Sequence, residues 1–147
     1  MARPIRPVAL ALVRNGGKIL VEEGQDSVKQ QTFSRLLGGT IEFGELGAEA
    51  VRRELREELG VESEVSGLVA AIENVFVYEG EPCHEILLVY ECVLRDEGLY
   101  SLTEWEASES TDAGMLTHRL AWKHPDSFRS GSEILYPEEM LPLLADH

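Results

Sequence analysis

The stretch GTIEFGELGAEAVRRELREELGV, residues 39–61, passes from a glycine-rich segment into a helical pattern. From Leu46 to Leu59 apolar residues recur every three or four positions, as one face of an α-helix requires. These positions are Ala48, Val51, Leu55 and Leu59. Gly60 follows as the residue expected just past a helix end. The pattern therefore predicts a loop followed by a helix over residues 46–59.

Three glutamates crowd one side of this predicted helix. Glu54, Glu57 and Glu58 stand three and four positions apart, so their carboxylates repel one another. At about 100° per residue, Glu58 borders the apolar stripe, Glu54 lies next to it, and Glu57 points furthest toward solvent. A solvated helix of ion pairs would explain the arginines, but clustered acids beside apolar protein either protonate or bind a cation. Oxygen ligands without Cys or His suit Mg²⁺ or Mn²⁺.

Elements on both sides of this stretch indicate the fold class. Before the helix, the sequence predicts strands over 7–14 and 18–23 around Asn15-Gly16-Gly17, a loop over 24–32 and a short strand within 33–45. After the helix, it predicts a hairpin of 67–78 with 83–94 and an irregular acidic segment over 96–112. A strand over 115–122 and a short helix starting at Pro137 follow. Strands thus flank one long helix, with a second helix at the end. We expect one domain over residues 1–147 of the α+β class, or an α/β sandwich with a mixed β-sheet.

The charge balance limits the partners of the protein. The 147 residues carry 27 acidic and 13 basic side chains, a formal net charge of −14. This argues against long nucleic acid and anionic membrane, whereas a small polyphosphate stays compatible because a divalent cation reverses the local field. Cys83 and Cys92 are too few for a disulfide framework, so we expect a reducing cytoplasm. The short apolar run near the amino terminus predicts neither a signal peptide nor a membrane span.

The glutamate-rich stretch also resembles a known motif. It matches, letter for letter, the 23-residue box of the Nudix hydrolases: Gly39, five residues, Glu45, seven residues, Arg53-Glu54, the aliphatic Leu55, any residue, Glu57-Glu58, any residue, Gly60 and the aliphatic Val61. Seven fixed letters, each used roughly 6% of the time, match by chance at a given start on the order of a few times in 10⁹. One departure lies upstream, where Leu37 replaces the proline of many relatives.

The resemblance implies a fold, an activity and a set of site residues. The fold would be the Nudix α/β/α sandwich with a mixed sheet and a loop-helix-loop metal site. Glu54, Glu57 and Glu58 would bind Mg²⁺ or Mn²⁺, with Glu57, Glu58 and Arg53 acting in catalysis. Gly39 and Glu45 would support the loop, or Glu45 would bind metal through water. The general base would be Glu57, Glu58 or a carboxylate outside the box.

Residues outside the box leave alternatives open. His84 and Glu85 are interpreted equally well as edge-strand polar residues and as substrate contacts. The extra acids that relatives often place in a later loop correspond here to Glu104, Glu106, Glu109 and Asp112. Each of these taken singly fits a solvated residue better. Strand aromatics Phe76, Tyr78 and Tyr90 fit the core better than a base-stacking platform.

The resemblance predicts an enzyme that hydrolyses a phosphoanhydride bond in a nucleoside diphosphate linked to a further group. The first candidates are nucleoside tri- or diphosphates. A nucleotide sugar or a dinucleoside polyphosphate is the alternative substrate. A nucleotide-binding regulatory module without turnover is the alternative from another class, and a homodimer stays open.

Overall fold

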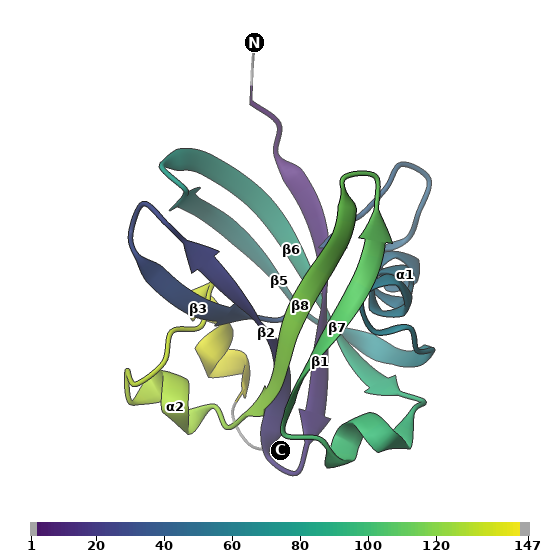
Figure 1. The fold of residues 1–147 in the computed structure, drawn as a ribbon. Coiled ribbons are helices and arrows are strands. Elements are labelled where there is room, and N and C mark those ends of the chain that lie inside the picture. Colours follow the sequence, from purple (N-terminus) through teal and green to yellow (C-terminus); the bar gives the residue numbers. More distant parts are fainter. Residues whose placement is uncertain (1–2, 145–147) are drawn as a thin grey trace.

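A mixed β-sheet forms the centre of the computed structural model, which describes residues 3–144 (Figure 1). Its strands are β1 (Arg6–Asn15), β2 (Lys18–Asp26), β3 (Gln31–Arg35), β4 (Leu37–Thr40), β5 (Ser63–Tyr78), β6 (Glu81–Leu94), β7 (Glu104–Thr111) and β8 (Gly114–Lys123). The strand order is β5-β6-β1-β2-β8-β7, with β3 paired to β2 and β4 paired to β1. Strands β1 and β6 run parallel and the other pairs antiparallel, which confirms the mixed sheet.

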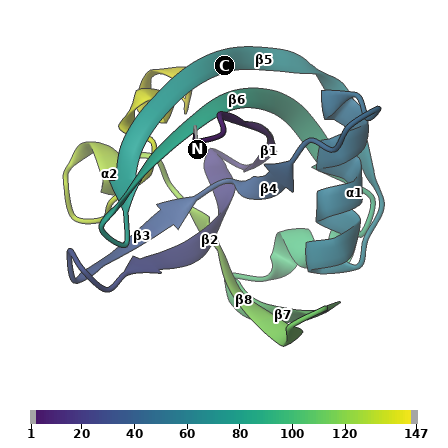
Figure 2. The same cartoon turned by 90° about the horizontal axis from the view of Figure 1, so that it is seen from above.

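Helices cover the sheet from both sides. They are α1 (Gly47–Leu59), η1 (Glu97–Ser101), α2 (Asp126–Arg129) and η2 (Glu138–Leu144), where η denotes a 3₁₀ helix. Strand β1 alternates between two apolar clusters: Leu10 packs with residues of α2 and η2, and Ala11 packs with residues of α1. Figure 2 shows α1 and the C-terminal segments on opposite sides of the strands. This arrangement confirms the expected sandwich.

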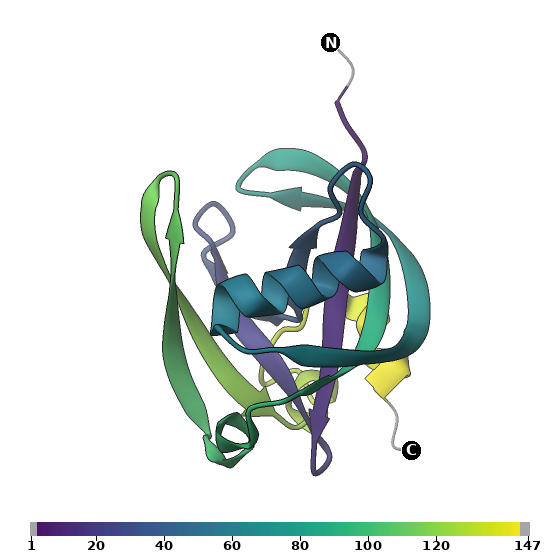
Figure 3. The same cartoon turned by 90° about the vertical axis from the view of Figure 1, so that its right-hand side faces the viewer.

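Helix α1 forms as its sequence predicts. The backbone N–H of Leu46 donates to the Glu49 carboxylate at 3.1 Å at the start of the helix, and Gly60 closes the end with φ of 71°. The buried face differs slightly from the prediction, because Ala48 and Leu59 are only partly buried whereas Glu58 lies inside. Figure 3 shows α1 crossing the strands, and the helix lies close to β1, β4, β5 and β7.

Two segments are more regular than the sequence predicted. The prediction of an irregular segment over 96–112 is wrong, because η1 and β7 occupy most of it. In β7, Trp105, Ala107 and Glu109 are partly buried while their neighbours are exposed, an alternation that the many acids obscured. The loop expected over 24–32 is shorter, since β2 continues to Asp26. The Asp26 carboxylate accepts from the N–H groups of Val28 and Lys29, each at 3.0 Å, and tightens the turn into β3.

The C-terminal part of the chain differs in detail from its prediction. Helix α2 was not expected, and the terminal helix after Pro137 is a 3₁₀ segment that contains Pro142. Its side chains Met140 and Leu144 are buried against the sheet. The predicted strand over 115–122 is confirmed as β8.

Two properties of residues 3–144 relate to environment. No helix among them has both the length and the apolar character that crossing a membrane demands. Both cysteines are free: Cys83 is partly buried on β6, and Cys92 is buried further along the same strand.

Candidate active site

Arg53 lies at the centre of a cluster of charged side chains on α1 and on the loop that precedes it. Its guanidinium donates to Glu45 at 2.8 and 3.0 Å, to Glu54 at 2.9 Å, to Glu57 at 3.3 Å and to the Thr40 carbonyl at 3.0 Å. These bonds tie α1 to the loop that precedes it. The two hydrogen bonds from Arg53 lower the pKa of Glu45 to about 2, so this carboxylate stays ionised.

Two glycines let the backbone of β4 approach its neighbours closely. Gly39 runs directly beside the Glu54 carboxylate, and a β-carbon there would overlap that carboxylate. Gly38 has φ of 153°, and a β-carbon on it would strike the Ala9 carbonyl of β1. The glycine pair therefore places bare backbone between β1 and the glutamates of α1.

Glu58 is the most unusual carboxylate in the cluster. Glu58 is only 4% exposed to solvent, and its Oε2 atom is buried without a hydrogen-bond partner. Burial, and then the charges of Glu22, Glu54 and Glu109, raise the pKa of Glu58 to about 10. An ionised Glu58 at neutral pH would require a cation at this position.

A polar chain, which we call the histidine chain, runs across the sheet from an exposed arginine through two buried residues to a partly buried glutamate. Its members are Arg35 on β3, Glu22 on β2, His118 on β8 and Glu109 on β7. Arg35 Nε donates to Glu22 Oε1 at 3.0 Å, and Glu22 Oε2 lies 2.9 Å from His118 Nδ1. His118 Nε2 lies 2.6 Å from Glu109 Oε1. Thus the chain ends at Glu109, whose charge acts on Glu54 and Glu58.

A cavity of about 410 Å³ joins these groups to an aromatic region. One part of its lining is Gly38, Gly39, Glu58, Glu109, His118 and Glu22, and another is Phe33, Phe76, Tyr78 and Tyr136. The interpretation of Phe76 and Tyr78 as core residues is therefore wrong, because both line this cavity. Tyr90 does pack against the apolar cluster beneath α1.

The cavity separates the candidates outside the box. Glu109 and Glu85 line it, and Glu85 makes an ion pair of 3.5 Å with Arg6. His84 does not line the cavity, because neighbouring residues of a strand point to opposite faces of the sheet. Asp112 lies exposed in the turn between β7 and β8, outside the lining. The structure thus brings Glu109 to the box and leaves His84 and Asp112 away from it.

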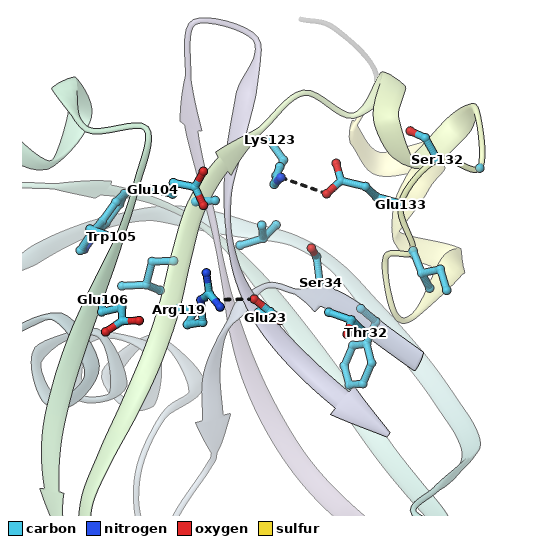
Figure 4. Close-up of a pocket in the computed structure, with 16 residues that line it drawn as sticks. Glu23, Thr32, Ser34, Glu104, Trp105, Glu106, Arg119, Lys123, Ser132 and Glu133 are labelled. Carbon is cyan, nitrogen blue, oxygen red and sulfur yellow. Dashed lines mark ion pairs between the residues drawn. The ribbon is translucent and has the colours of Figure 1, made fainter. Parts of the chain in front are cut away.

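A second, larger cavity of about 580 Å³ lies on the other face of β2 and β8 (Figure 4). It contains the two remaining acids, Glu104 and Glu106, and no residue of the box. Figure 4 shows ion pairs across it, between Arg119 and Glu23 at 3.5 Å and between Lys123 and Glu133 at 2.9 Å.

The residues at the box fit a divalent metal by chemistry. Glu54, Glu57 and Glu58 supply only hard oxygen ligands, and the unpartnered Oε2 of Glu58 lacks a positive partner. The side chains are not assembled around one point: within residues 3–144, no three His, Cys, Asp or Glu side chains are grouped as a metal site. Glu54 and Glu57 instead share the guanidinium of Arg53.

Glu22 and His118 are site residues that the sequence reasoning missed. Both occupy inward positions of strands: Glu22 follows the buried run Ile19 to Val21, and His118 alternates with the buried Leu120. A polar residue at an inward strand position was the available signal, because burying such a group is costly unless it is paired.

Two comparisons of the sequence with known proteins give matches. A family model described as "NUDIX domain" matches residues 4–132. The CTP pyrophosphohydrolase of Escherichia coli (strain K12) is 38% identical over 64 residues, 44% of this chain and 47% of that protein, so the match spans about half of that relative.

Two solved structures share the fold. The solution structure of the E. coli ORF135 protein gives a TM-score of 0.58 at 25% identity, covering 95% of this chain and 86% of that one. The crystal structure of the MutT protein from Methanosarcina mazei Go1 gives a TM-score of 0.65 at 18% identity, covering 98% and 93%. At that identity the second likeness concerns the fold alone.

Proposed function

Because the chain belongs to the NUDIX domain family, we propose that it is a pyrophosphohydrolase acting on a nucleoside diphosphate linked to a further group. The observation that carries this proposal is the buried, unpartnered Oε2 of Glu58 in a cavity that continues to aromatic side chains. A cation and a phosphate chain would occupy the acidic part, and a nucleoside would occupy the aromatic part.

Each residue of the box has a physical role in this proposal. Glu54, Glu57 and Glu58 would hold Mg²⁺ or Mn²⁺. When bound, the metal offsets negative charge that develops on the phosphoryl oxygens. Arg53 holds Glu54 and Glu57 in place, and Glu45 fixes Arg53 from the loop side.

The backbone of Gly38 and Gly39 lines the cavity in which the phosphate chain would lie, and Gly39 packs directly against the Glu54 carboxylate. Water attacks phosphorus, and Glu57, Glu58 or Glu109 accepts its proton.

Nucleoside triphosphates are the first substrates to test, and cytidine nucleotides the first among them. Glu85 and Asn74 are cross-strand neighbours that line the cavity, and Glu85 is paired with Arg6 at 3.5 Å. Glu85 can only accept, whereas Asn74 can donate and accept, which suits a base with an amino group beside a ring nitrogen, such as cytosine. The likeness to a CTP pyrophosphohydrolase supports the same choice.

A substrate screen with Mg²⁺ or Mn²⁺, scored by product mass, tests this proposal. We expect a nucleoside triphosphate to give a monophosphate with pyrophosphate, or a diphosphate with phosphate. A sugar phosphate or a second nucleotide among the products would indicate the alternative substrates. Nucleotide binding without any product would favour a regulatory module.

Metal removal is the matching control for that screen. Excess EDTA should abolish turnover while the circular dichroism spectrum stays unchanged, because the apolar core does not depend on the ion. Full turnover in EDTA would contradict the proposed chemistry. Homodimer formation stays a prediction, which light scattering on the purified chain would decide.

A further inference from the structure

The histidine chain connects the interior of the sheet with the proposed reaction centre. We propose that His118 and Glu22 are positioning residues, and that they hold Glu109, the carboxylate outside the box that the proposed function places beside the attacking water. This inference rests on the proposed function and adds residues of β2 and β8 to it.

The register of the strands explains why the histidine chain is built from long side chains. His118 pairs across the sheet with Ala107, so Glu109 is a diagonal neighbour two residues along β7. Glu22 pairs with Leu120, so it is likewise two residues from His118 along β8. Diagonal neighbours are separated by about 7–8 Å, a distance that the imidazole ring bridges on both sides. The ring is therefore held at both nitrogens, at 2.9 and 2.6 Å.

Hydrogen-bonding groups follow one another without a gap along the chain. Both neighbours of His118 are carboxylates, and they lie 2.9 and 2.6 Å from its two ring nitrogens. Arg35 donates to Glu22 at the far end of the chain, at 3.0 Å. Such a chain keeps a carboxylate inside the protein at a lower cost than an isolated carboxylate would have.

Glu109 needs this support because its other neighbours repel it. Burial, together with nearby carboxylates that include Glu109, raises the pKa of both Glu54 and Glu58. Strand β7 is the last strand of the sheet, so nothing beyond it in the strand order holds the side chain from outside. The bond from His118 uses Oε1, while Oε2 of Glu109 makes no hydrogen bond within residues 3–144. That second oxygen is free to accept from water in the cavity.

Two substitutions of His118 separate positioning from a general structural role. In His118→Gln the amide nitrogen takes roughly the place of Nε2 and keeps a donor toward Glu109. In His118→Asn it takes roughly the place of Nδ1, which keeps the donor toward Glu22 and removes the one toward Glu109. We expect about a tenfold loss of kcat in His118→Asn, a smaller loss in His118→Gln, and little change of KM in either.

A double-mutant cycle tests whether His118 acts through Glu109. Glu109→Gln should lower kcat by about 10²-fold, and adding His118→Asn to it should cost little more. Equal losses in His118→Asn and His118→Gln, or fully multiplicative losses with Glu109→Gln, would overturn the inference. Thermal melts of all variants show which of them fold.

Further variants keep this test independent of the proposed function. Should His118→Asn fail to fold, Glu22→Gln replaces it in the cycle, and we expect a loss of roughly threefold to tenfold that likewise vanishes beside Glu109→Gln. An unchanged kcat in Glu22→Gln would then overturn the inference. Full activity in Glu58→Gln would refute the proposed function itself. An inactive Glu58→Gln together with a fully active His118→Asn would refute only the positioning role.

Discussion

The two cavities on opposite faces of β2 and β8 are lined by similar residue types, but their charged side chains differ in pairing and in burial. In the larger one, Arg119 pairs with Glu23 and Lys123 pairs with Glu133, in positions that solvent reaches. In the smaller one, Glu58 is buried without a partner on Oε2. Exposed ion pairs contribute little and need no ligand, whereas an uncompensated buried carboxylate calls for one. The buried carboxyl group without a partner, and not the volume of the cavity, is therefore the feature that supports the proposed site.

Neighbouring residues of one strand show how this difference arises. Glu22 and Glu23 are adjacent in the sequence, yet their side chains are 4% and 31% exposed and line different cavities. Strand alternation sends one inward to His118 and the other outward to Arg119. The same residue type thus has different chemistry on the two faces.

The largest expected effect separates the cavities by activity. Glu58→Gln keeps the shape of the side chain and removes the carboxyl group that would ionise beside a bound cation, so we expect kcat to fall by at least about 10²-fold. Glu104→Gln, in the other cavity, is the matched control and should leave kcat unchanged. Steady-state kinetics at saturating Mg²⁺ measures both. A comparable loss of kcat in Glu104→Gln would contradict the assignment of the reaction to the smaller cavity.

A smaller effect on activity is expected in Gly39→Ala, which adds one methyl group. A β-carbon there overlaps the Glu54 carboxylate, which is the flexible end of a side chain and moves aside. We expect about a tenfold loss of kcat/KM with a thermal midpoint within roughly 2 °C of the wild type.

Gly67→Ala on β5 is the control for this change, because a β-carbon there meets no other atom within 4 Å. Equal activities of the two glycine variants would mean that the position of Glu54 has no part in catalysis.

The smallest effect concerns the stability of the metal-free protein. The pKa of Glu58 is raised to about 10 in the native state, whereas its ordinary value is 4.5. As pH rises above the ordinary value, the unfolded chain releases this proton and the native protein keeps it. The free energy of unfolding therefore falls with rising pH between about 5 and 10, by at most about 1.4 kcal/mol per pH unit.

Thermal melts at pH 6.5 and 7.5, with EDTA, measure this slope. Glu58→Gln should be less sensitive to pH than the wild type, and Glu104→Gln should match the wild type. Identical slopes in wild type and Glu58→Gln would show that the carboxylate titrates normally. Adding Mg²⁺ should raise the midpoint of the wild type more than that of Glu58→Gln, since an ion that binds the native state alone stabilises it.

Residues 39–61 could be interpreted without the fold because their signals are local. Helical periodicity, the glycine after Leu59 and the spacing of Glu54, Glu57 and Glu58 all lie within a few turns of one helix. The hairpins were predicted for the same reason, since Asn15-Gly16-Gly17 and long β-branched runs act over short distances. The acidic composition obscures the alternation of β7, because many acids close together are typical of a solvated loop.

The rest of the site depends on contacts between distant parts of the chain. Glu22 and His118 are 96 positions apart, and their contact follows from the register of β2 with β8. Four acids of the later segment looked equivalent in the sequence, yet strand alternation sends Glu104 and Glu106 to one cavity and Glu109 to the other. Register and burial are set by packing of the whole sheet, and a one-residue slip would exchange the two faces. For this reason the proposed metal ligands can be predicted from a motif, whereas the residues proposed to support them become visible only in the folded chain.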